Sequence, residues 1–115
     1  MDAQPHPGLG EGLALLARGD GFAAHEAFEA AWRAAPAPER DFYQGLVHVA
    51  VAPYQESRGN AVGRGRQLEK ARRRLAPYAP AHQGVDVAAL LAWCDRSLAG
   101  EPCGIPPVAP RGRAE

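Results

Sequence analysis

Hydrophobic positions recur along the chain with the spacing of an α-helix in five stretches. Leu9, Leu13 and Leu16 begin the pattern, and residues 45–52 are apolar on nearly every side. Apolar residues three and four apart share one helix face, whereas a helix apolar all round is usually the buried middle of a bundle. The expected helices span residues 9–18, 21–35, 38–58, 60–77 and 86–99. This pattern predicts an all-α fold, a single compact bundle of about five helices with the second and third at its centre.

Helix-ending and helix-starting residues stand between these stretches. Gly19 is suited to the left-handed position after a helix and Asp20 to the cap of the next helix, and Gly59 and Asn60 repeat this pair. Asp86 is expected to cap the fifth helix. Pro53 lies inside the third expected helix and removes one backbone donor. We therefore expect Pro53 to kink that helix or to end its regular part.

The expected domain organisation has three parts. Residues 1–8 form a flexible N-terminus, residues 9–99 a single helical domain, and residues 100–115 a proline-rich irregular or disordered tail. Gly63 and Gly65 fall inside the fourth expected helix, where each costs about 1 kcal/mol relative to alanine. A tight helix crossing would explain them.

Composition narrows the class of protein. The chain has 115 residues, which suits one domain, and its formal net charge of zero does not indicate a general nucleic-acid binder. Its two cysteines show no CxxC spacing and suit a reducing compartment. We find no signal peptide and no apolar run of the ~20 residues that a membrane span needs. The composition predicts a cytoplasmic protein without a membrane partner.

One face of the second expected helix carries polar and aromatic side chains together. At 100° per residue, His25, Glu26, Glu29 and Trp32 fall on the same side as Phe22. The opposite side is almost pure alanine. We expect the alanine side to press against a neighbouring helix.

The polar face has three interpretations, and we favour the first. His25 and Glu29 turn inward and form hydrogen bonds with Gln44 and His48, which lie four apart on the third expected helix. Arg58 pairs with Glu26 or Glu29. The result is a buried polar network that lines a small cleft.

The other two interpretations use the same residues differently. In one, the face is solvated and Glu29 forms an ion pair with Arg33 worth about 0.2–0.5 kcal/mol. In the other, His25, Glu26 and Glu29, with His48, belong to a metal-dependent enzyme, and His25, Glu29 and His48 bind a divalent metal ion. "HEAFE" is not the HExxH zinc motif. The sequence therefore favours a protein without a cofactor over one that binds a divalent metal ion.

Several motifs together resemble the domain of unknown function 309 family, small all-helical proteins of bacteria and archaea. They are His25-Glu26-x-x-Glu29-x-x-Trp32, "YQGLVHVAVA" from Tyr43, "RGN" from Arg58 followed by Gly63, and "GVD" from Gly84. The resemblance covers about residues 15–91 and implies several packed helices but no particular activity.

The resemblance also implies a signature and shows where this chain departs from it. The signature comprises His25, Glu26, Glu29, Trp32, Gln44, Gly45, Arg58, Gly59 and Asn60. Family members often carry glutamine where His48 stands and histidine near Tyr54 or Gln55. The departure favours a structural or binding role for the signature over a shared catalytic metal site.

Charge is divided unequally along the chain. Residues 1–57 sum to −5, whereas residues 58–74 sum to +6. The candidate basic patch comprises Arg64, Arg66, Lys70, Arg73 and Arg74. No aromatic residues alternate with these charges, so a nucleic-acid partner is not favoured.

Three function classes remain open from the sequence. They are a binding or interaction module, a metal-dependent enzyme, and a nucleic-acid accessory protein that uses the basic fourth helix. A homodimer is compatible with so small a bundle. His6 and His82 stand in proline-bordered loops and are expected at the surface.

Overall fold

The helices of the computed structural model, which describes residues 5–108, follow the predicted order. They are α1 (Pro7–Ala17), α2 (Gly21–Ala34), α3 (Ala37–Ser57), α4 (Ala61–Leu75), the one-turn 3₁₀ helix η1 (Ala76–Tyr78) and α5 (Val87–Leu98). The predicted all-α class is confirmed. Within the described residues, strand-like pairing is limited to one isolated β-bridge between His82 and Val85.

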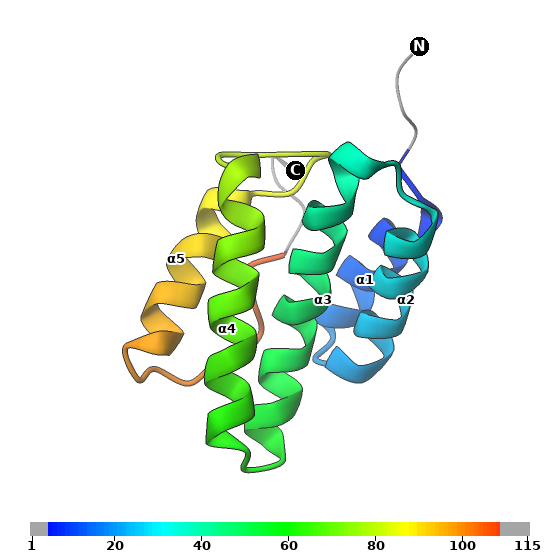
Figure 1. Cartoon of the computed structure of the whole chain (residues 1–115). Coiled ribbons are helices and arrows are strands. Elements are labelled where there is room, and N and C mark those ends of the chain that lie inside the picture. Colours follow the sequence, from blue (N-terminus) through cyan, green and yellow to red (C-terminus); the bar gives the residue numbers. More distant parts are fainter. Residues whose placement is uncertain (1–4, 109–115) are drawn as a thin grey trace, which may run out of the picture.

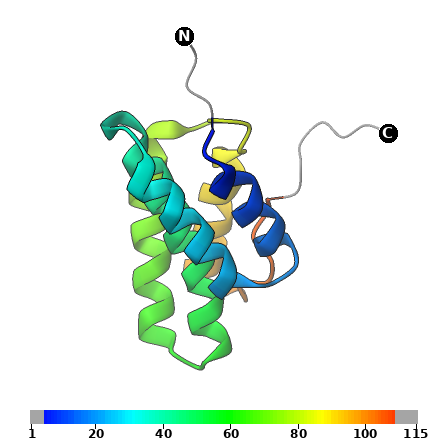
Figure 2. The same cartoon turned by 90° about the vertical axis from the view of Figure 1, so that its right-hand side faces the viewer.

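Helices that are consecutive in the chain pack against one another. Figure 1 shows α3 and α4 side by side, with α1 and α2 beyond α3 and α5 beyond α4. The view turned by 90° shows that α1 and α2 form one side of the bundle (Figure 2). Because α3 packs on both α2 and α4, its nearly uniform apolar surface is covered from two directions.

The predicted caps are confirmed. The side chains of Asp20, Asn60 and Asp86 each accept a hydrogen bond from the backbone N–H three residues further on. Gly19 and Gly59 follow α1 and α3 with φ angles of 84° and 74°, which glycine adopts without a steric penalty. Local sequence chemistry therefore sets these helix boundaries.

One of the two outcomes expected for Pro53, and the tight crossing expected at Gly65, were wrong. Pro53 does not end α3, which continues to Ser57, and its last turn is held by the N–H of Arg58 donating to the carbonyls of Tyr54 and Gln55. A Cβ atom built on Gly65 would meet nothing within 4 Å among residues 5–108, so no tight crossing explains this glycine. Close helix approaches lie instead at Gly12 and Gly21.

The core runs through all five helices. Its largest fully buried side chains are Phe28, Phe42, Leu16, Leu46, Leu68, Leu75, Leu90, Val49, Val87, Cys94 and Ser97. Burial of large apolar side chains stabilises each by roughly 1.5–3 kcal/mol relative to exposure. This shared core holds α1, α2 and α3 together, and these helices position the candidate site.

Residues 100–108 form no helix but pack on the bundle. The indole Nε1 of Trp93 donates to the carbonyl of Cys103 at 2.7 Å, and Cys103 is buried. Arg64 donates to Glu56 at 2.9 Å and to the carbonyls of Ser97 and Glu101. Residues 1–4 and 109–115, which belong to the predicted N-terminus and tail, lie outside the described residues. Among residues 5–108, no helix combines the length and the apolar character that crossing a membrane requires.

Candidate functional site

The polar face of α2 points outward. The predicted packing of the alanine side is confirmed in part: Ala27 and Ala31 are buried, whereas Ala30 and Ala34 are exposed. On the polar side, His25 and Glu29 are only partly covered and Glu26 is exposed. The inward orientation expected for His25 and Glu29 was wrong. The small alanines occupy the contact face because they allow close helix packing, and charged groups outside avoid the cost of losing water.

Local partners hold the signature residues of α2. The Nδ1 of His25 donates to the carbonyl of Phe22 at 2.6 Å, which leaves its Nε2 without a proton in the neutral ring. Glu29 lies 3.5 Å from Arg33, whose side chain is 67% exposed, so this pair contributes little. The guanidinium of Arg40 lies 4.8 Å from the ring centre of Trp32. These contacts correspond to the solvated-face interpretation.

The signature residues of α3 and the following turn have partners other than the expected ones. His48 faces α4, where its Nδ1 donates to the Oε1 of Gln67 at 2.7 Å. Arg58 lies over the ring of Tyr54 at 5.6 Å instead of pairing with Glu26 or Glu29. This pairing was wrong because α3 carries Arg58 against its own preceding turn.

The remaining polar signature residues, Asn60 and Gln44, form no hydrogen bond with α2 among residues 5–108. Asn60 donates from its Nδ2 to Gln55 at 3.0 Å in addition to capping α4. Gln44 is half-buried and forms no hydrogen bond among residues 5–108.

The predicted metal ligands do not come together. His25 and Glu29 lie on the outer face of α2, whereas His48 is bonded to α4. Among residues 5–108, no group of three histidine, cysteine, aspartate or glutamate side chains is arranged to hold a metal ion.

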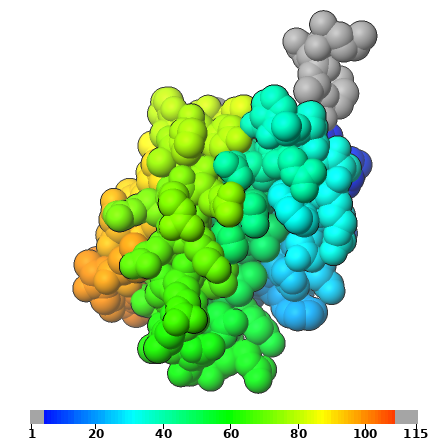
Figure 3. All heavy atoms as spheres, viewed as in Figure 1, coloured from blue at the N-terminus to red at the C-terminus, as the bar shows by residue number. Residues whose placement is uncertain are grey.

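The basic patch is partly neutralised by acids from other helices. Arg64 pairs with Glu56 at 2.9 Å, and Arg74 pairs with Asp41 at 2.7 Å. On the face seen in Figure 3, α4 is exposed between α5 and the α2–α3 side. Three members of the patch form no ion pair in the described part of the chain: Arg66, Lys70 and Arg73.

The folded bundle disfavours protonation of His48. Burial lowers its pKa below the usual value, the hydrogen bond to Gln67 raises it in part, and the charges of Lys70 and Arg74 lower it further. Between the lowered pKa and the unfolded value of about 6.5, the unfolded chain binds more protons. Stability therefore falls as pH decreases through this window.

We expect His48→Gln to reduce this pH dependence. Glutamine can still bond to Gln67 but does not titrate, so the loss of stability just below about pH 6.5 becomes smaller. Urea denaturation at a series of pH values measures it. An unchanged pH slope in the variant would show that other groups are responsible.

Two pockets lie at opposite ends of the α2–α3 pair. The smaller, with a volume of about 180 Å³, is lined by Gly21, Phe22, His25, Val51, Tyr54 and Gln55. His25 is therefore the one signature residue of α2 that lines it.

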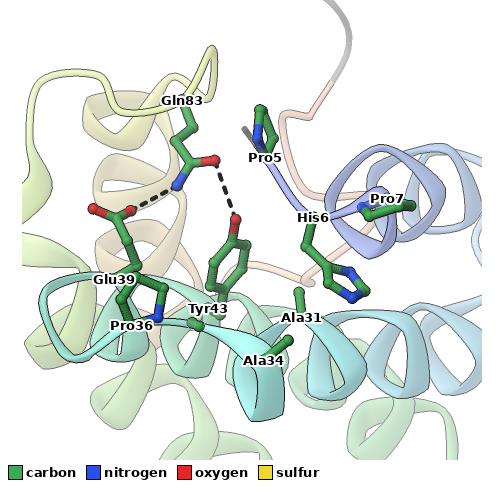
Figure 4. Close-up of a pocket in the computed structure, with 10 residues that line it drawn as sticks. Pro5, His6, Pro7, Ala31, Ala34, Pro36, Glu39, Tyr43 and Gln83 are labelled. Carbon is green, nitrogen blue, oxygen red and sulfur yellow. Dashed lines mark hydrogen bonds between the residues drawn. The ribbon is translucent and has the colours of Figure 1, made fainter. Parts of the chain in front are cut away.

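The second pocket, which we call the Glu39 cleft, is larger and more polar. It has a volume of about 310 Å³ and lies between the start of α1, the end of α2, the start of α3 and the 82–85 turn (Figure 4). Its apolar lining comprises Pro5, Pro7, Ala31, Ala34, Ala35 and Pro36. Its polar lining comprises His6, Glu39, Tyr43 and Gln83.

A hydrogen-bond network surrounds the carboxylate of this cleft. The Oε1 of Glu39 accepts from the Nε2 atoms of His82 and Gln83, each at 2.6 Å. Tyr43 donates its hydroxyl proton to the Oε1 of Gln83 at 3.1 Å (Figure 4). An ionised carboxylate can only accept, so it fixes the proton of His82 on Nε2 and the orientation of the Gln83 amide.

The network keeps Glu39 ionised. Burial raises the pKa of Glu39, but the hydrogen bonds from His82 and Gln83 outweigh it, and the net pKa lies below the usual value. No lysine or arginine among residues 5–108 forms an ion pair with this carboxylate.

A tight turn aims His82 and Gln83 at Glu39. His82 and Val85 exchange backbone hydrogen bonds of 3.0 and 2.8 Å, and the two residues between them have positive φ angles, 49° at Gln83 and 79° at Gly84. A left-handed conformation costs a non-glycine residue roughly 1–2 kcal/mol. Backbone strain of this kind persists where surrounding contacts determine it, and it is concentrated at functional sites.

Sequence patterns did not reveal this site. His82, expected at the surface, is 29% exposed and paired with Glu39, and His6 is half-buried and caps α1 by accepting from the N–H of Gly8. Glu39 and Gln83 are 44 positions apart. The turn-forming Gly84 was the available local signal, and it does not say where Gln83 points.

The fold and the cleft define a small helical bundle with a partly enclosed polar pocket at one end. The family model described as "domain of unknown function (DUF309)" matches residues 9–66, about half of the chain, and the protein belongs to this family. The match includes Glu39 and Tyr43 but not His82 or Gln83. Comparison with curated proteins and with solved structures gave no match.

Proposed function

We propose that this protein is a helical binding module and that the Glu39 cleft is its ligand site. One observation carries the proposal: an ionised, half-buried carboxylate stands among apolar side chains in the larger of the two pockets described above. Ligand sites are typically concave and mostly apolar, with a few polar groups that fix orientation. Glu39, Tyr43 and Gln83 supply those groups.

The strain at Gln83 supports the same assignment. Its positive φ angle is costly, yet it directs the amide toward both Glu39 and Tyr43. A loop that only connected α4 to α5 would not need a glutamine in this conformation. The 82–85 turn instead completes the wall of the cleft.

The binding-module class is the one that the sequence favours, but the ligand site lies in the Glu39 cleft instead of on the polar face of α2. The signature on α2 faces solvent, and the polar network lies at the other end of α2 and α3. The metal-dependent alternative has less support because His25 and Glu29 lie apart from His48. The nucleic-acid alternative has less support because two of the five patch residues are paired with acids.

Filling the cleft should abolish binding. Ala34 is exposed and lines the cleft, so the side chain of Ala34→Trp is expected to occupy the pocket without entering the core. Ala30→Trp is the matched control, because Ala30 is equally exposed on α2 but lines neither described pocket.

The measurement is a screen of small fragments of mixed charge by two-dimensional amide NMR spectra of the full chain. We expect bound fragments to shift the signals of Ala31, Glu39 and Gln83 in the wild type and in Ala30→Trp, but not in Ala34→Trp. Fragments that shift only the surroundings of His25, or that bind Ala34→Trp unchanged, would refute the assignment.

A further inference from the structure

In the Glu39 cleft, the strongest hydrogen-bonding group still available to a ligand is the carboxylate of Glu39. The Oε1 of Glu39 already accepts two hydrogen bonds, whereas Oε2 accepts none among residues 5–108. The hydroxyl oxygen of Tyr43 gives its proton to Gln83 and keeps its lone pairs. Two acceptors, one of them charged, are therefore left for a ligand.

The donors that remain are neutral or lie across the cleft. Gln83 keeps one N–H of its amide. His6 accepts from Gly8 through Nδ1, so the neutral ring carries its proton on Nε2, and Figure 4 shows this ring on the opposite side of the view from Glu39 and Gln83. No lysine or arginine among residues 5–108 lines the cleft. Hydrogen bonds to a charged partner are roughly twice as strong as neutral ones, so the carboxylate decides which ligand is preferred.

The helix ends around the cleft do not reverse this preference. Ala31, Ala34 and Ala35 belong to the end of α2, and the C-terminal end of a helix carries a partial negative charge. The positive ends of α1 and α3 also lie here, but His6 caps the first and Glu39 stands in the first turn of the second. Among residues 5–108, the charged side chain that lines the cleft is Glu39, and its partner His82 carries a charge only when protonated.

We propose that the Glu39 cleft binds a small organic cation that carries a primary ammonium group on a short aliphatic body. This inference rests on the proposed binding function and names the class of its ligand. The ammonium group donates to the Oε2 of Glu39 and to the hydroxyl oxygen of Tyr43. The aliphatic body lies against the alanine and proline side chains of the lining.

The geometry selects this cation over two others. A guanidinium binds best to both oxygens of a carboxylate, but two protein donors already occupy Oε1 of Glu39. A quaternary ammonium is recognised by a cage of aromatic rings, and Tyr43 is the one phenyl or indole side chain in this lining. The volume of about 310 Å³ is at the lower end for ligand pockets, roughly 300–1,000 Å³, and suits a short molecule.

The test compares three probes with the same five-carbon chain and different head groups: pentylamine, pentan-1-ol and pentanoate. Titration of the full chain, followed by amide NMR, gives an affinity for each. We expect pentylamine to bind most tightly and Glu39→Gln to weaken it by about tenfold or more, about 1.4 kcal/mol. Glu26→Gln, which removes an exposed carboxylate of α2, is the matched control and should leave the affinity unchanged.

Two additional measurements keep the result interpretable. Tyr43→Phe retains the carboxylate and removes one acceptor, so it should weaken pentylamine less than Glu39→Gln does. It also covers the case in which Glu39→Gln fails to fold. N-acetyl-lysine methylamide separates a free amine from a lysine side chain of a peptide, and we expect it to bind more weakly because its backbone does not fit the cleft.

Each other outcome overturns the inference in a recognisable way. If pentan-1-ol or pentanoate binds as tightly as pentylamine at the same residues, the ligand class is wrong and the binding function stands. The same holds if no probe binds while other fragments still shift the cleft signals. If nothing binds to the cleft, both the inference and the proposed function fail. Equal binding of pentylamine to Glu39→Gln also refutes the inference.

Discussion

Replacing Phe28 by alanine is expected to destabilise the protein by about 3–5 kcal/mol. Phe28 is fully buried, and α1 passes directly over its ring: a Cβ atom built on Gly12 would lie 2.4 Å from the ring atom Cε1. The loss combines the transfer of a large apolar group with the cavity left between α1 and α2. For a small domain this is a large part of a total stability of about 5–15 kcal/mol.

Phe22 provides the matched control on the same helix. Its side chain is 50% exposed, with ring contacts to His25 and Tyr54. Phe22→Ala should therefore cost about 1 kcal/mol or less. Urea denaturation followed by circular dichroism compares the two variants. Equal losses would contradict the orientation of α2 described above.

Gly21→Ala is expected to destabilise the protein by about 1–3 kcal/mol, through the contact between α2 and α3. A Cβ atom at this position would lie 2.5 Å from the carbonyl oxygen of Ala50. That oxygen belongs to the backbone of α3 and cannot rotate away, so the start of α2 must move. The usual gain in helix propensity from alanine is smaller than this cost.

Gly10→Ala should change stability in the opposite direction. Gly10 is an exposed residue of α1, and a Cβ atom there would meet nothing within 4 Å. Alanine should therefore stabilise α1 by roughly 0.5–1 kcal/mol. Thermal and urea denaturation of both glycine variants provide the comparison. Stabilisation by both would show that α2 and α3 do not approach as closely as described.

The orientation of α2 shows why a helical pattern is only partly informative. The periodic arrangement separated an alanine side from a side with His25 and Glu29, and this separation is present in the structure. It did not say which polar side chains would meet α3. The buried face of α2 includes Ala24, Phe28 and Ala31, and the polar side remained in water because burying charged groups is costly.

His48 shows the same limit on another helix. Its place in an apolar run indicated burial, and the structure half-buries this residue. Its partner is Gln67 on α4 because α3 packs between two helices, and its register turns this position toward α4. A partner of this kind depends on helix rotation, which local periodicity does not determine.

The sequence by itself determined the helices, their caps at Asp20, Asn60 and Asp86, and the alanine contact side of α2. Each depends on interactions within a few residues or on one repeating pattern. Only the tertiary structure decided the Glu39 cleft, because Glu39 and Gln83 lie 44 positions apart and meet through a turn with two positive φ angles. The physical reason is that a hydrogen bond depends on position in space, and only the packed bundle brings these two distant residues together.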